Sequence, residues 1–173
     1  GAFLATSHLI QQGFRNIGYL KSSDRIANFE ERADGYYKAL RYYGLEHPSC
    51  YVQDLTPSME GAYHDMQKYL EGNPPLAEAY FVDNDLIAAG ALRAFQEAGI
   101  KMPEEVSMIG FDNIPICSFL TPALSTMHVD KGALGSFAVD LALQRLTGVS
   151  SSATVKLEVS PSLIVRESVS LHS

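Results

Sequence analysis

Polar side chains follow two apolar runs that are typical of buried strands. Asn84 lies in the polar cluster that ends the run 79–82. Asp112 ends the run 106–111 in the same way, and Arg32 lies one turn into the helix predicted after the first strand. A carboxylate accepts hydrogen bonds from hydroxyls, an amide both donates and accepts, and a guanidinium offers a planar fork of donors. These residue types suit a small ligand that is rich in hydroxyl groups.

Each of these residues also has a purely structural interpretation. Asn84 and Asp83 are suitable caps for a helix that begins at Asp85, and Asp112 is suitable for an ordinary Asx turn. Arg32 has glutamates directly before it, although helical residues one or two positions apart do not face each other. Their convergence on one edge of a sheet favours a binding site.

The stretch 77–122 contains both strand ends and reads as one strand–helix–strand unit. Its central apolar residues follow helical spacing, Gly99 is a typical C-terminal stop, and Pro103 prevents the helix from continuing. Two strands joined by one amphipathic helix imply a parallel pair with a right-handed crossover. Open parallel sheets bind ligands at the carboxyl ends of their strands. Asn84 and Asp112 are therefore expected at neighbouring strand ends.

Helices and strands alternate along the whole chain. This alternation predicts an α/β fold, a three-layer αβα arrangement with a mostly parallel sheet. Asn28 and Thr56 are the expected N-caps of the second and third helices. The predicted helices are 1–12, 28–43, 56–72, 85–99 and 131–146, and the predicted strands are 17–20, 50–53, 79–82, 106–111, 124–127, 155–159 and 163–165.

The composition excludes several classes of protein. A net charge of −7 over 173 residues argues against nucleic-acid binding by this chain alone. No apolar run reaches membrane-spanning length, and the N-terminus has no signal-peptide pattern. Cys50 and Cys117 match no metal or redox spacing, so we expect two free, buried thiols in a reducing cytoplasm.

Motifs for catalysis and for cofactors are absent from the sequence. There is no phosphate-binding glycine loop and no G-x-S-x-G elbow. The five histidines never pair at helical spacing, and no two acidic residues are placed for acid–base work by the sequence alone. We therefore predict no catalytic residues, no metal site and no cofactor, and the sequence gives no reason to propose an enzyme.

Several ordered blocks resemble the LacI/GalR family of transcriptional repressors, and together they span essentially the entire chain. The L-T-P-x-L-S-T block followed by L-G favours the repressors over their periplasmic sugar-binding relatives. The blocks are HLIQQGFRNIGYL (8–20), ERADGYYKAL (31–40), EGAYHDM (60–66), FVDNDLIAAGALRAFQEAGIKMPEEVSMIGFDN (81–113), LTPALSTMHVDKGALGSFA (120–138) and VSPSLIVRESV (159–169).

The resemblance implies an effector-binding core of the periplasmic-binding-protein type. In the family, an arginine, an asparagine and an aspartate of these blocks contact the effector, and the matching positions are Arg32, Asn84 and Asp112. A polar contact near the arginine corresponds to Asn28. An aromatic residue that often lines the pocket corresponds to Leu55, a departure that leaves an apolar wall rather than a stacking ring.

The resemblance also implies that this chain is a C-terminal fragment. A family repressor carries a helix-turn-helix, a hinge helix and the first half of an N-terminal subdomain before the position of Gly1. Residues 1–127 and 162–173 would then form the C-terminal effector-binding subdomain, and 128–161 would supply a helix and a strand to the missing N-terminal subdomain. The 131–146 helix would expose an apolar stripe, so we expect it to pack against another copy or to swap between chains.

These inferences predict the ligand-sensing part of a cytoplasmic LacI-type regulator. It would be a homodimer with a small-molecule effector, probably a carbohydrate by the family's habit, and would reach operator DNA only through the missing N-terminal domain, without contact to a membrane. The chain alone has half a cleft and should bind effector weakly. The residues remain compatible with a pyranose, a disaccharide, a nucleoside or purine, or a phosphorylated sugar. The alternatives are a truncated periplasmic sugar-binding protein of a transport system and, with almost no sequence support, an enzyme.

Overall fold

A six-stranded sheet forms the centre of the molecule, in the strand order β2-β1-β3-β4-β5-β6. The computed structural model describes residues 1–46, 49–148 and 154–171. Strands β1 to β5 pair in parallel, and β6 is antiparallel to β5. The predicted α/β class with a mostly parallel sheet is therefore confirmed. The strands are β1 (Ile17–Ser22), β2 (Val52–Leu55), β3 (Ala79–Val82), β4 (Ser107–Asp112), β5 (Ser125–His128) and β6 (Ser162–Ile164).

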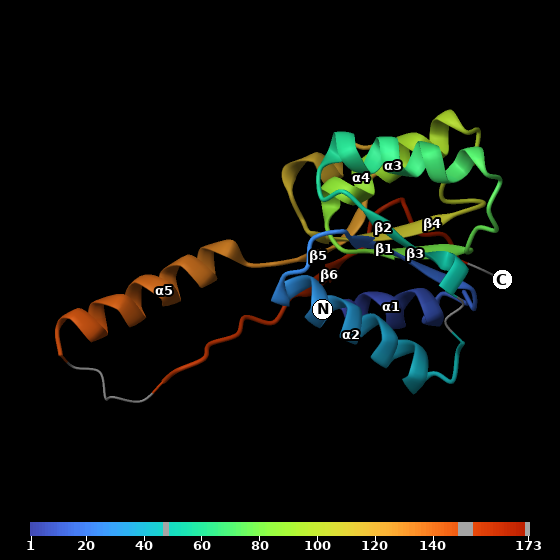
Figure 1. Ribbon diagram of the computed structural model, residues 1–173. Coiled ribbons are helices and arrows are strands. Elements are labelled where there is room, and N and C mark those ends of the chain that lie inside the picture. Colours follow the sequence, from blue (N-terminus) through green and yellow to red (C-terminus); the bar gives the residue numbers. More distant parts are fainter. Residues whose placement is uncertain (47–48, 149–153, 172–173) are drawn as a thin grey trace.

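Two pairs of helices cover the two faces of this sheet (Figure 1). Helices α1 (Ala2–Gln11) and α2 (Ala27–Tyr42) lie on one face, and α3 (Met59–Glu71) and α4 (Asp85–Glu97) lie on the other. Each pair buries its apolar stripe against the sheet, which gives two separate hydrophobic clusters. Gly90 lets α4 approach α3 closely, because a Cβ there would collide with the backbone carbonyl of Met59. We call this part of the chain, residues 1–128 and 162–171, the sheet body.

Three expected element boundaries were wrong. Helix α2 has Ile26 as its N-cap residue, so Asn28 lies inside the first turn rather than before it. Helix α3 is capped by Ser58, whose hydroxyl accepts the Gly61 N–H, instead of by Thr56. The Thr56 backbone N–H donates to an Asp65 carboxylate oxygen at 2.8 Å, which keeps this residue outside the helix. The expected strand 50–53 begins with a 3₁₀ turn and pairs only from residue 52 onward.

Helix α5 (Lys131–Leu146) stands away from the sheet body at the end of two extended connections (Figure 1). Asp130 caps it by accepting the Ala133 N–H at 2.9 Å, yet the helix has no buried residue. The strand expected over 155–159 was wrong, because residues 154–161 have no regular structure. An extended segment becomes a strand only when a neighbour accepts and donates its backbone hydrogen bonds, and the ladder with β5 starts at Ser162. We call residues 129–161 the α5 excursion.

The search for membrane-spanning helices gives a negative result. Among the residues that the structure describes, no helix combines the length and the apolar character that crossing a bilayer requires.

Candidate functional site

The carboxyl ends of β1, β3 and β4 meet at one edge of the sheet, because neighbouring parallel strands point the same way. Asp83 and Asn84 follow β3, and Asp112 ends β4. Asp112 and Asn113 have φ angles of 106° and 48°. Asp and Asn adopt this left-handed region more readily than most residues do, so they let the chain turn sharply at the edge.

Arg32 reaches from α2 to this edge and joins the ends of two strands. Its Nη1 donates to the backbone carbonyl of Asp83, and its Nη2 lies 3.1 Å from Asp112 Oδ1. The guanidinium carbon lies 3.9 Å from the centre of the Phe111 ring, within the range of a cation–π contact. The side chain is 16% exposed, so this is a held arginine rather than a free surface cation. The structure thus brings Arg32 and Asp112 together as the sequence predicts.

Asn84 combines the capping role with an open polar group. Its Oδ1 accepts the Ile87 N–H at 2.8 Å, so the helix-cap interpretation is confirmed. Within the described part of the chain, its Nδ2 has no hydrogen-bond partner. Asn84 is partly exposed at the same edge as Arg32. The cap fixes the amide orientation and leaves its N–H donors for a ligand.

The carboxylate of Asp112 is partly desolvated and is held from two sides. Burial raises its pKa, and the Arg32 guanidinium partly opposes that rise. Lys131 Nζ, from the first turn of α5, donates to the backbone carbonyl of Asp112 at 2.6 Å. Oδ1 is engaged by Arg32, whereas Oδ2 has no partner among the described residues. One carboxylate oxygen is therefore available as an acceptor.

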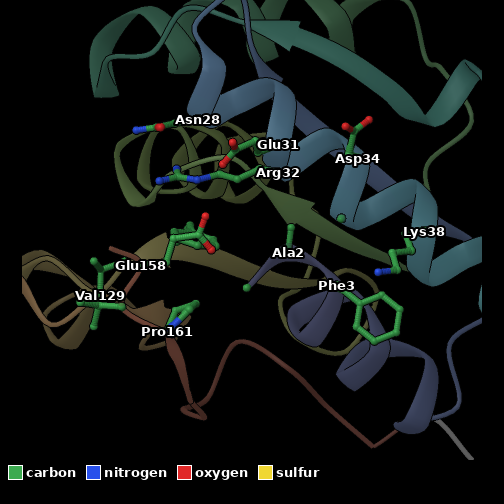
Figure 2. A pocket seen from close by; sticks show the side chains of 14 residues that line it. Ala2, Phe3, Asn28, Glu31, Arg32, Asp34, Lys38, Val129, Glu158 and Pro161 are labelled. Atoms are coloured by element: carbon green, nitrogen blue, oxygen red, sulfur yellow. The ribbon is translucent and has the colours of Figure 1, made fainter. Parts of the chain in front are cut away.

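Asn28 lies one helical turn before Arg32, and both line a cavity of about 540 Å³ (Figure 2). Figure 2 shows the cavity between the start of α2, the start of α1 and the connections of the α5 excursion, represented by Val129 and Pro161. Asn84 and Asp112 do not belong to its lining. Arg32 therefore stands between this cavity and the strand ends.

Leu55 differs from the other expected site residues. It ends β2 at the same edge, but its side chain is only 2% exposed. It belongs to the hydrophobic cluster that also contains Ala62 and Met66 of α3. The structure therefore places no apolar wall of a ligand pocket at Leu55.

Two buried carboxylates on either side of Asn84 were missed at the level of sequence. Asp83 accepts hydrogen bonds from the Tyr19 hydroxyl at 2.5 Å and from the Ser22 N–H at 2.6 Å. Asp85 accepts from the Thr126 hydroxyl at 2.6 Å and from the Ile114 N–H at 2.9 Å. Burial raises the pKa of both carboxyls. A polar cluster after a strand resembles a set of helix caps, so only the three-dimensional contacts separate these roles.

The thiols and the metal search add two results. Cys117 is buried, and desolvation raises its pKa to about 12, whereas Cys50 is exposed, contrary to the expectation of two buried thiols. Cys50 lies in the 3₁₀ turn that precedes β2, where the chain is still outside the sheet. Among the described residues, no group of three or more His, Cys, Asp or Glu side chains is arranged to hold a metal ion.

Comparison with known proteins identifies the family. Residues 6–169 match the family described as periplasmic binding protein-like domain. This chain belongs to that family. Among curated proteins, this periplasmic binding protein-like chain is 36% identical over 169 residues to the HTH-type transcriptional repressor PurR of Pasteurella multocida, across 98% of the chain and 50% of that protein. It is 37% identical over 169 residues to the HTH-type transcriptional regulator GalS of Salmonella typhimurium, across 98% of the chain and 49% of that protein.

Solved structures agree with this assignment and support the recognition of LacI-family features. A LacI family transcriptional regulator from Enterococcus faecium with bound ribose has a TM-score of 0.88 at 27% identity, covering 100% of this chain and 63% of that one. A lac repressor dimer bound to operator and the anti-inducer ONPF has a TM-score of 0.88 at 25% identity, covering 98% of this chain and 57% of that one. The chain spans about half the length of the curated relatives that it matches.

Proposed function

We propose that this chain is the effector-binding part of a LacI-type transcription regulator and that its effector is a neutral, hydroxyl-rich small molecule. The observation that carries the proposal is the bridge from Arg32 to Asp112 and to the Asp83 carbonyl, with the Asn84 amide beside it at the sheet edge. The similarity to PurR, to GalS and to the ribose-bound regulator supports the regulatory role.

The hydrogen-bonding groups left open at the edge favour a neutral ligand. Both terminal nitrogens of Arg32 are already engaged, and its charge is paired with Asp112. What remains among the described groups is an acceptor, Asp112 Oδ2, and a donor, Asn84 Nδ2. A hydroxyl group can donate to the first and accept from the second. Of the ligand classes that the sequence leaves open, sugars and nucleosides fit better than phosphorylated sugars.

The α5 excursion, in this proposal, belongs to a second subdomain that closes over the edge. The expected boundaries, 1–127 and 162–173 against 128–161, are supported by the absence of buried residues in α5. Leu134, Phe137 and Leu143 of α5 are 39%, 43% and 53% exposed, more than apolar side chains of a stable helix normally are. A second subdomain that covers them would also supply the opposite wall of the cleft.

Regulation would then follow from a shift between open and closed forms. An effector that bridges the two subdomains binds the closed form better, so it shifts an equilibrium that exists without it. Coupling of this kind alters operator affinity in the complete protein. We propose that the protein acts as a homodimer in the cytoplasm; the dimeric, operator-bound state of the similar lac repressor supports this.

The decisive experiment measures effector binding by the longest form of the protein that its gene encodes. A thermal-shift screen would include ribose, hexoses, disaccharides, nucleosides and sugar phosphates, and calorimetry would give the dissociation constant of each hit. We expect a neutral sugar or nucleoside to bind and the matching phosphorylated compounds to bind at least tenfold more weakly. The present chain alone should bind weakly or not at all, because it has one wall of the cleft.

The variant Asp112→Asn tests the site itself. It removes the charged acceptor and leaves the Arg32 guanidinium without its ion-pair partner, so affinity should fall by about thirtyfold or more. Asp140→Asn, which removes one carboxylate from the exposed face of α5, is the matched control and should leave affinity within twofold. Equal affinity of both variants for the effector would contradict the proposed site.

A further inference from the structure

A buried tyrosine–aspartate pair lies directly beneath the candidate site. Tyr19 and Asp83 are 0% and 1% exposed, and the Tyr19 hydroxyl donates to Asp83 Oδ1 at 2.5 Å. Asp83 Oδ2 accepts the Ser22 N–H at 2.6 Å, and the Asp83 N–H donates to the Leu20 carbonyl at 3.0 Å. The pair therefore ties the end of β3 to the end of β1 through side chain and backbone together.

The same aspartate residue also holds the arginine of the site. Its backbone carbonyl accepts from Arg32 Nη1, and Arg32 Nη2 continues the chain of contacts to Asp112. The residue that follows is Asn84, whose amide is the open donor at the edge. A change in the position of the Asp83 backbone would thus move the guanidinium and the amide at once.

We propose that Tyr19 and Asp83 are positioning residues for effector binding, which set the places of Arg32 and Asn84 without touching the effector. The proposal rests on the proposed function, because it assigns these residues to the same site. Tyr19 enters the contact from the interior, and its ring packs against Tyr36 at 4.9 Å and Phe81 at 5.4 Å between ring centres. Rings packed on both sides allow little rotation, so the hydroxyl is a fixed reference point for Asp83.

Burial makes the pair sensitive to the loss of either member. A buried carboxylate that loses a hydrogen-bond donor keeps its full desolvation penalty, and it relaxes by moving toward another donor or toward water. Desolvation raises the pKa of Asp83, and the hydrogen bond from Tyr19 opposes that rise. Without the tyrosine hydroxyl, the strand end that carries Asn84 and the carbonyl used by Arg32 would lose this anchor.

The test compares two tyrosines of one aromatic cluster. Tyr19→Phe removes the hydroxyl that contacts Asp83. Tyr36→Phe is the matched control, because Tyr36 is also 0% exposed and its hydroxyl donates to the Ile17 carbonyl at 2.8 Å, at the opposite end of β1. Both variants lose one buried hydrogen bond, so we expect similar decreases in melting temperature. Only Tyr19→Phe should change the site.

Two readouts separate positioning from general stability. In ¹⁵N-labelled protein without ligand, the guanidinium protons of Arg32 should exchange with water at least about tenfold faster in Tyr19→Phe than in the wild type, and unchanged in Tyr36→Phe. In calorimetry with the sugar or nucleoside found by the screen, Tyr19→Phe should lose about tenfold in affinity and Tyr36→Phe less than twofold. The variant Asp83→Asn should give the same result as Tyr19→Phe and replaces it if Tyr19→Phe does not fold.

The possible results are unambiguous. Wild-type exchange at Arg32 in both Tyr19→Phe and Asp83→Asn would overturn the proposal, as would equal losses of affinity in Tyr19→Phe and Tyr36→Phe. If the wild type binds none of the compounds, the proposed function fails, whereas the exchange measurement still decides whether Tyr19 and Asp83 position Arg32.

Discussion

Helices α4 and α5 carry similar numbers of apolar side chains, but they have opposite environments. Most residues of α4 are buried between α3 and the sheet, whereas α5 has no buried residue and extends away from the sheet body. The apolar spacing predicts a helix in both cases, and both helices form. Spacing thus indicates that a helix has an apolar face, while only a packing partner determines whether that face is buried.

Proteolysis should show the largest difference between the two regions. Trypsin at low protein concentration should cut after Arg145 at least about a thousandfold faster than after Arg93 in α4, because opening a helix without buried contacts costs little and opening α4 requires sub-global unfolding. Mass spectrometry of the early fragments gives the order of cleavage. Cleavage after Arg93 at the same rate would show that α5 is covered. Protection of Arg145 that grows with protein concentration would support the expected packing of α5 against another copy.

Truncation of a phenylalanine should have very different costs in the two helices. Phe95 of α4 is 0% exposed, so Phe95→Ala should lower the free energy of unfolding by about 3–5 kcal/mol. Phe137 of α5 is 43% exposed, and Phe137→Ala should change it by less than about 0.5 kcal/mol. Urea denaturation followed by circular dichroism measures both. A cost above 2 kcal/mol for Phe137→Ala would show that a partner buries this face.

Glycine-to-alanine changes should differ in sign between the helices. Gly90→Ala in α4 should destabilise the protein by about 1–3 kcal/mol, because the new methyl group would collide with the Met59 carbonyl of α3. A Cβ at Gly135 in α5 meets no atom within 4 Å. Gly135→Ala should therefore stabilise α5 by about 1 kcal/mol through helix propensity. Thermal melts report the first change, and helical circular dichroism reports the second; a loss of helix signal in Gly135→Ala would contradict it.

The smallest expected effect is a pH dependence from the buried carboxyl of Asp85. Burial raises its pKa in the folded protein above the unfolded value of about 3.9. The folded state therefore binds more protons between these two pKa values, and the stability that Asp85 contributes falls as the pH rises through the folded pKa.

Unfolding free energies of the wild type and of Asp85→Asn at several pH values between 4 and 7 test this dependence. The wild type should lose stability relative to Asp85→Asn as the pH rises. Asp140→Asn in α5 controls for the loss of one negative charge. A difference between wild type and Asp85→Asn that is constant over this range would show that Asp85 does not titrate as inferred.

Much of the site edge was predictable because it depends on strand direction alone. Once β3 and β4 are recognised as parallel neighbours, Asn84 and Asp112 must lie at adjacent strand ends, and Arg32 on the following helix can reach them. Side-chain direction is harder to predict. Leu55 lies at the expected edge, but it points into the core under α3, because a position transferred by resemblance carries no orientation.

The contacts that support the site come from residues far apart in the sequence, which sequence spacing does not reveal. Tyr19 reads as an ordinary apolar strand residue, and its contact with Asp83 depends on the β1–β3 register. The Lys131 contact with the Asp112 carbonyl depends on where the α5 excursion leaves the sheet. The strand expected over 155–159 failed for a related reason, because an alternating pattern does not supply a neighbouring strand.

The pairing of β5 with β6 has a consequence for how the chain can be rearranged. His128 lies opposite Ser162, so the two strands form a hairpin whose connection is the whole α5 excursion. The entropy of closing a loop grows only with the logarithm of its length, and replacing this connection with a short turn would change it by about 2 kcal/mol. The register of the hairpin is set by the strands and not by what joins them. The sheet can therefore accept a longer, shorter or unrelated insertion at this point without altering the edge that carries Arg32, Asn84 and Asp112.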